Sequence, residues 1–188
     1  MKVTTLAALL LAYCILVACT RTSPNAQLVQ ADSLMQKSPD SALHFLEKIY
    51  PEKLKSLEDQ AYYALLVTQA QDKNYIFQEN DSLIRVAVQY YDSIKSTSMQ
   101  AKAHYYWGCI WRNREIYPQA LSRFFTAISY AQKTSDHKLT GYIYNNIANL
   151  YFLQKLYEQA DSIYQITEKI AIQEKDSGLW ADALSQRG

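Results

Sequence analysis

The 188-residue chain has little of what interrupts helices and no excess of charge of either sign. Four glycines and four prolines punctuate the whole length, so long helices are the expected structure. Lys and Arg number 19 against 18 Asp and Glu, which leaves no basic face for a phosphate backbone and argues against a nucleic-acid partner. An apolar content of 49% is typical of a globular chain rather than a disordered one, and the length favours one domain.

The chain also lacks the patterns that build reaction centres. The three histidines, His44, His104 and His137, have no His, Cys or carboxylate at metal-ligand spacing. No glycine-rich loop is present to hold a phosphate, and no serine lies in a nucleophile-elbow context. We therefore expect a protein that is not an enzyme and has neither cofactor nor metal. His104 is expected at the edge of the core.

Cysteine is scarce, and two of the three cysteines lie in an N-terminal segment unlike the rest. A basic Lys2 precedes an apolar run over residues 6–17. This run is shorter than the roughly 20 residues of a membrane-spanning helix, and it is typical of a secretory signal peptide. Cys109 is then left without a disulfide partner, and we expect it to be a buried free thiol.

The apolar run ends in Leu16-Val17-Ala18-Cys19, which resembles the lipobox of bacterial lipoproteins. The resemblance implies that residues 1–18 are removed as a signal peptide, that Cys19 carries the lipid, and that residues 19–25 form a tether. It also implies a bacterial cell-envelope protein, bound to a membrane through this lipid and facing the periplasm. Thr20, in place of the Asp of many inner-membrane lipoproteins, favours the outer membrane. An ordinary cleaved signal and an uncleaved anchor are the alternatives.

A period of forty residues runs through the chain from about residue 61. Residues 116–120 recur as residues 156–160, and Gly108 corresponds to Ala148. Periods of this size indicate stacked supersecondary units.

Each unit is expected to be a pair of helices. Apolar residues recur at spacings of three and four, and the two helical stretches of a unit are separated by a short polar turn, as at residues 113–115. Pro118 falls in the first turn of a helix, where its missing N–H has no cost. Gly108 and Ala120 would let the paired helices approach each other closely.

These positions resemble the tetratricopeptide repeat (TPR). The pattern has a small residue, an aromatic, an alanine, a large apolar and a small residue, and it reads Gly108, Trp111, Ala120, Phe124 and Ala127, then Ala148, Tyr151, Ala160, Tyr164 and Thr167. The period of forty exceeds the usual 34, and Gln132 stands where the repeat usually has proline. The resemblance implies an all-α fold, a right-handed superhelical solenoid of antiparallel helix hairpins.

The repeats divide the chain into 61–100, which is degenerate, 101–140, 141–180 and a partial unit at 181–188. Residues 26–60 are expected to form an N-terminal helix pair, either a cap or a divergent repeat. Ser38 and Pro39 are the start signal of its second helix. No polar capping helix follows the last apolar face, so we expect the chain to be a fragment of a longer protein; the alternative is that the last helix docks unpaired.

The resemblance also implies a concave binding face made by the first helix of each unit. Its mapped positions include Leu65, Gln69, Asp72 and Cys109, and the candidates are Tyr62, Lys102, Tyr105, Arg112, Tyr142, Asn145, Asn149 and Phe152. Asn145 and Asn149 are one helical turn apart, so both amides could address one extended peptide; the alternative is that they are hydrogen-bonded between helices.

The first functional expectation is a membrane-anchored TPR lipoprotein that binds a protein or peptide. The second is the N-terminal sensor part of a longer signal-transduction regulator, because residues 31–35 and 39–43 resemble the periplasmic TPR region of bacterial membrane regulators. The third is a glycan-binding lipoprotein, if the pairs Tyr90-Tyr91 and Tyr105-Tyr106 each present one ring outward.

Overall fold

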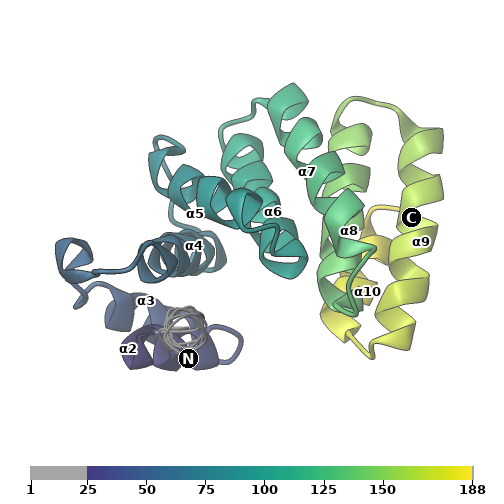
Figure 1. Ribbon diagram of the computed structural model, residues 1–188. Coiled ribbons are helices and arrows are strands. Elements are labelled where there is room, and N and C mark those ends of the chain that lie inside the picture. The colour runs from purple at the N-terminus through teal and green to yellow at the C-terminus, as the bar shows by residue number, and fades with distance from the viewer. Residues whose placement is uncertain (1–24, 188) are drawn as a thin grey trace, which may run out of the picture.

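A computed structural model describes residues 25–187, which form nine α-helices and one short 3-10 helix, with no strand in that range (Figure 1). The all-helical class expected from the sequence is confirmed. The expected signal peptide and Cys19 lie outside the described residues.

The helices follow one another in pairs. A short pair comes first, and three longer pairs and a last single helix follow. In order they are α2 (Ala26–Leu34), α3 (Pro39–Leu46), the 3-10 helix Pro51–Lys53, α4 (Leu57–Lys73), α5 (Ser82–Ser93), α6 (Thr97–Asn113), α7 (Tyr117–Ala131), α8 (His137–Leu153), α9 (Tyr157–Gln173) and α10 (Ser177–Ser185). Helices α4, α6 and α8 each have 17 residues, and their first residues are forty positions apart. The forty-residue period of the sequence therefore equals the spacing between the first helices of successive pairs.

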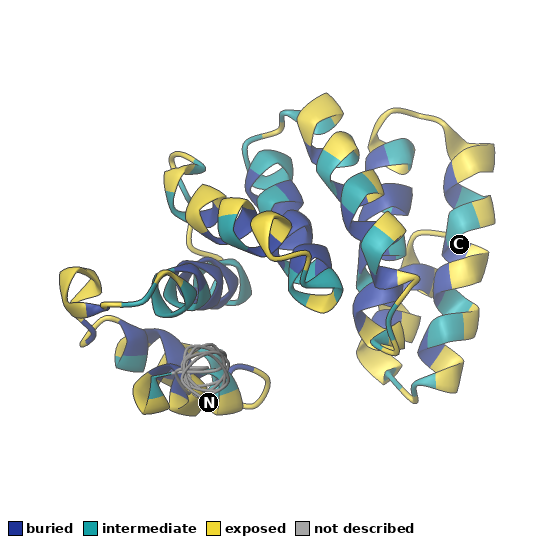
Figure 2. Ribbon diagram, viewed as in Figure 1, coloured by how far each residue is buried: buried dark blue, intermediate teal, exposed yellow. Residues whose placement is uncertain are grey.

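Each helix packs against the next one along the chain, and the faces turned toward neighbours are the buried ones (Figure 2). The first helices of successive pairs also touch, α2 with α4, α4 with α6, and α8 with α10. Helices α6 and α8 are an exception, because long side chains make most of the connection between them. The row of helices therefore opens between α6 and α8.

The same turn joins the two helices in each of the three longer pairs. Tyr75, Glu115 and Lys155 have φ of 57°, 59° and 62°, the left-handed conformation that ends many helices. The N–H of the next residue then donates to a carbonyl of the last helical turn, at 2.9 Å in all three pairs. As predicted, Ser38 is the N-cap of α3 with Pro39 in its first turn, and Pro118 lies in the first turn of α7.

Gly108 marks the closest approach between α6 and α7. A Cβ atom on Gly108 would lie 2.5 Å from Cε1 of Phe124, whose side chain is completely buried. Ala120 and Ala127 of α7 are also fully buried. The role expected for the glycine and the alanines, close helix contact, is confirmed.

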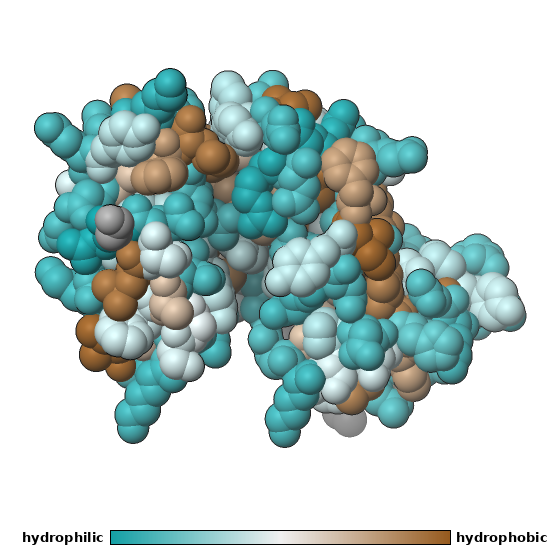
Figure 3. Space-filling view, turned by 180° about the vertical axis from the view of Figure 1, so that it is seen from behind, coloured by the Kyte–Doolittle hydropathy of each residue, from teal (hydrophilic) through white to brown (hydrophobic). Residues whose placement is uncertain are grey.

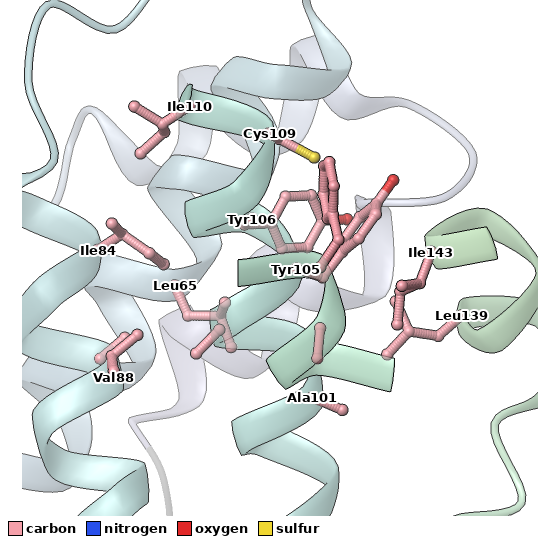
Figure 4. Close-up of a cluster of buried hydrophobic side chains, with 14 of the residues drawn as sticks. Leu65, Ile84, Val88, Ala101, Tyr105, Tyr106, Cys109, Ile110, Leu139 and Ile143 are labelled. Carbon is pink, nitrogen blue, oxygen red and sulfur yellow. The ribbon is translucent and has the colours of Figure 1, made fainter. Parts of the chain in front are cut away.

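The main core lies between α4, α5, α6, α7 and α8, and part of it is drawn in Figure 4. The rings of Tyr105 and Tyr106 meet edge to face with centroids 4.9 Å apart, and both are buried. The expectation that one of these rings points outward is therefore wrong, since the open space between α6 and α8 needs both rings to fill it. Cys109 is a buried free thiol, as predicted, and burial raises its pKa, so it stays protonated and unreactive.

A second aromatic arrangement lies between α6 and α7. The His104 ring stacks between Tyr130 and Trp107, with centroids 5.8 and 6.1 Å away. Arg123 lies over the other side of Trp107, 3.5 Å from its centroid. Nε2 of His104 is 3.4 Å from Oδ1 of Asp92 on α5, while its buried Nδ1 has no hydrogen-bond partner. Burial lowers the pKa of His104.

Gly108→Ala should destabilise the protein by about 1–3 kcal/mol, because its methyl group would overlap a ring that cannot move away. Gly178→Ala is the matched control, since the nearest atom to its added Cβ is 3.5 Å away, and it should leave stability equal or slightly higher. Urea unfolding of the three proteins measures both effects. Equal stability of the Gly108→Ala variant and the native chain would contradict the close contact.

Acid should destabilise the native chain through His104. Its folded-state pKa lies below the ordinary 6.5, so as the pH falls through about 6.5 the unfolded chain binds a proton that the folded chain resists. The free energy of unfolding should therefore decrease from pH 7 toward pH 5. His104→Phe keeps a ring in the stack and should show a weaker decrease of the free energy of unfolding. His44 is exposed, so His44→Phe should show the same decrease as the native chain. Identical pH dependence in all three would refute the assignment.

Candidate functional site: a groove across α2, α4, α6 and α8

One face of the molecule is hollowed between its N-terminal and C-terminal helices (Figure 3). Two adjoining pockets, each of about 220 Å³, form this hollow, which we name the central groove. They share Asp32, Gln69 and Lys102. The first of these pockets lies where α6 and α8 are spread apart, and the second lies beside it against α4, α5 and α6.

The two pockets differ in chemistry. The lysine pocket is defined by Lys73, Lys102 and Lys138 together with Asp32, Asp72, Asp136, Tyr105 and Tyr142. The apolar pocket is defined by Tyr62, Leu65, Leu66, Tyr91, Ile94 and Met99. Lys102 on α6 stands between them.

Helix starts set the polar rim of the groove on the α8 side. The Asp136 carboxylate accepts the N–H of Leu139 at 2.9 Å, which caps α8. Asp176 caps α10 in the same way, forty residues later, and accepts the Tyr142 hydroxyl at 2.9 Å. Lys138 pairs with Asp176 at 2.8 Å. Capping, which helices need in any case, therefore places these side chains at the groove.

Arg112 connects three first helices at the far end of the groove. Its Nη2 donates to Oδ1 of Asp72 on α4 at 3.0 Å, and its Nη1 donates to Oδ1 of Asn146 on α8. Nδ2 of Asn146 in turn donates to the Tyr105 hydroxyl at 3.4 Å. The side chains of Arg112 and Asp72 are 29% and 13% exposed, so this ion pair is largely shielded from water. The network joins α4, α6 and α8 where the backbones of α6 and α8 diverge.

Four of the residues that the sequence predicted for binding meet at the central groove. Tyr105 and Tyr142 line the lysine pocket, Tyr62 lines the apolar pocket, and Lys102 lines both. The Tyr62 hydroxyl donates to Oδ2 of Asp32 at 2.7 Å. The other mapped positions Leu65, Gln69 and Asp72 also lie there.

The other four predicted residues lie elsewhere or are engaged in the fold. Arg112 borders a separate pocket beside Tyr75 and Phe77. Asn145 is 6% exposed, and its side-chain oxygen has no partner. Asn149 accepts the hydroxyl of the buried Tyr164 on α9, which is the alternative of a bond between helices.

Phe152 is 37% exposed and meets Tyr157 edge to face, with ring centroids 5.4 Å apart, in a different pocket near α10. The four predicted residues that line the groove therefore lie at or before the middle of α4, α6 and α8, whereas Arg112, Asn149 and Phe152 lie toward the C-terminal ends of α6 and α8.

Sequence reasoning missed Lys73, Lys138, Asp32 and Asp136. Lys73 is the last residue of α4, and Asp136 and Lys138 lie at the start of α8. A pattern that considers only mid-helix positions overlooks helix ends. The capping signal of Asp136 was present in the sequence, but the nearness of α2, which brings Asp32, was not.

Charge and burial set the behaviour of the groove's titrating groups. Burial raises the pKa of Tyr62, and its bond to Asp32 adds to the effect. Burial and the Asp176 contact do the same for the pKa of Tyr142. Both hydroxyls therefore stay protonated and act as hydrogen-bond donors. Burial and nearby Lys138 lower the pKa of Lys73, although Asp72 and Asp176 oppose this.

The groove is lined by tyrosine hydroxyls, lysines and carboxylates beside an apolar pocket. Among residues 25–187, no group of three or more His, Cys, Asp or Glu is placed to hold a metal ion. In the same range, no helix is long and apolar enough to cross a bilayer.

A comparison with known protein families found no match, and no curated protein is significantly similar to this chain.

Arg112→Ala should destabilise the protein by about 2–3 kcal/mol, because it leaves Asp72 and Asn146 without their partner in a shielded position. Arg85→Ala, on the exposed side of α5, is the matched control and should change stability by less than about 0.5 kcal/mol. Urea unfolding at low salt measures both. A neutral Arg112→Ala would mean that the network contributes no net stability.

Proposed function

We propose that this chain is a non-enzymatic binding protein of TPR type that holds a peptide or an extended protein segment in its central groove. The helix pairs would stack as a right-handed solenoid, anchored to a membrane of the bacterial cell envelope through lipid on Cys19.

Several features support the repeat architecture. The TPR-like residues Gly108 and Phe124 form the close contact between paired helices. The first helices begin at forty-residue intervals, and the strong contacts join helices that are one or two places apart in the chain. Repeat proteins have this arrangement, in which each unit contacts its neighbours and the curve of the stack makes a long concave surface.

The division of the groove into two small adjoining pockets is the observation that carries the proposal. Pockets for small molecules usually measure about 300–1,000 Å³. Each pocket of the groove has about 220 Å³, and the two adjoin across four helices. Such a row of small pockets suits successive side chains of an extended polypeptide better than one compact ligand.

The N-terminal tether sets the proposed orientation at the membrane. The N–H of Asn25 donates to Oδ1 of Asp59 in the first turn of α4, at 2.9 Å. Residues 19–24 can span at most about 20 Å. A lipid on Cys19 would therefore hold the N-terminal ends of α2 and α4 near the membrane surface.

The proposal predicts that peptides selected from a random display library on the immobilised chain bind in the central groove. Lys102→Trp would fill the space shared by the two pockets and should weaken these peptides at least about tenfold. Arg85→Trp, exposed on α5, is the control and should leave their affinity unchanged. Fluorescence anisotropy titrations measure the affinity, and thermal melts establish that both variants fold.

Two results would contradict the proposal. One is a library that yields no peptide above background. The other is a set of peptides whose affinity is the same for the native chain and the Lys102→Trp variant.

A further inference from the structure

The carboxylates of the lysine pocket already have hydrogen-bond donors within the fold. Three carboxylates line it, and each already accepts a hydrogen bond: Asp32 from Tyr62, Asp72 from Arg112, and Asp136 from the N–H of Leu139. The pocket also has three lysines, so its formal charges balance. The carboxylates, however, accept their hydrogen bonds from neutral groups or from Arg112, and not from these lysines. Any charged group that remains available for a ligand must therefore be found among the lysines.

Two of the three lysines have no carboxylate partner. Lys138 pairs with Asp176 at 2.8 Å. The ammonium of Lys73 contacts only a neutral amide, Oε1 of Gln36, at 3.3 Å. Within residues 25–187, no carboxylate oxygen lies within 4.0 Å of the ammonium of Lys73 or Lys102.

Lys73 is the more constrained of the two. It is half-buried, and the loss of water around it lowers its pKa. A half-buried ammonium without an anion gains more from an incoming carboxylate than an exposed one does, because less water screens the contact.

The apolar pocket adjoins this cationic position. Leu65 and Leu66 are 1% exposed and form its base, while Ile94, at 52%, and the half-buried Met99 line its opening. Lys102 borders both pockets, so an apolar side chain in one lies next to the ammonium groups of the other.

We infer that the central groove selects an extended peptide segment that puts an apolar side chain in the apolar pocket and a carboxylate, one or two residues away, on Lys73 and Lys102. This inference rests on the proposed function and adds the chemistry of the ligand to it. Side chains two residues apart project from the same side of an extended chain, which fits two pockets in a row.

Defined peptides test this chemistry. The probe is the acetylated and amidated heptapeptide Ser-Gly-Leu-Ser-Glu-Gly-Ser, with one version carrying Gln for Glu and another carrying Ser for Leu. Saturation-transfer NMR titration with the full chain measures affinity and shows which peptide protons touch the protein. The Glu peptide should bind about five- to tenfold more tightly than the Gln peptide, with saturation strongest at the Leu methyl groups. The Ser version should bind most weakly.

Paired lysine variants locate the effect. The Lys73→Gln/Lys102→Gln variant should bind the Glu peptide and the Gln peptide with about equal affinity. The matched control Lys55→Gln/Lys169→Gln removes the same charge from exposed positions outside the groove and should keep the native preference. Raising the salt concentration from 50 to 500 mM should reduce the preference in the native chain and in the control.

The inference is overturned by equal affinity of the Glu and Gln peptides, by a preference that persists in Lys73→Gln/Lys102→Gln, or by no detectable binding of the Glu peptide. These outcomes differ from failure of the proposed function. Library peptides that are sensitive to Lys102→Trp but lack acidic residues would keep groove binding and reject only the carboxylate chemistry.

Discussion

Phe124 occupies the space beside Gly108 that any larger residue would fill, and this close contact between paired helices is the constraint on which the rest of the structure depends. The corresponding residues of the next pair, Ala148 and Tyr164, are buried in one cluster, and those of the preceding pair, Thr68 and Ile84, are also buried. Each pair is thereby a rigid unit, because a fully packed side chain cannot be displaced without opening a cavity. Stacking such units then determines where the first helices lie.

The groove arises where that stacking is least regular. Helix α4 lies against α6, and α8 against α10, but α6 and α8 are joined through Tyr105, Arg112 and Asn146. Large and polar side chains hold these helices apart, which opens the row at its centre. The cost is a set of buried polar groups that must all find partners. Arg112 bonds Asp72 and Asn146 at once and so stabilises the opening.

The polar groups of the groove have two origins. Asp136 is there because α8 needs a cap, and Asp176, which caps α10, bonds Tyr142 and Lys138 at the edge of the groove; both would be present in a repeat protein without any ligand. Lys73 and Lys102 have no such structural duty, since neither pairs with a carboxylate among residues 25–187. Because the aspartates already make capping or ion-pair contacts and these two lysines do not, we assign the lysines to a ligand and the aspartates to the fold.

The sequence by itself determined the helices, their pairing and the close approach of paired helices at Gly108 and Ala120, because helical periodicity, turn signals and small residues act over short distances along the chain. It also named Tyr62, Lys102, Tyr105 and Tyr142 as candidates for one surface, and these four residues line the central groove. Only the tertiary structure decided that Tyr106 is buried, that Asn149 holds Tyr164, and that Lys73 stands beside Lys102. These outcomes depend on the angle and spacing between helix pairs. Side chains far apart in the sequence set both, so no local pattern records them.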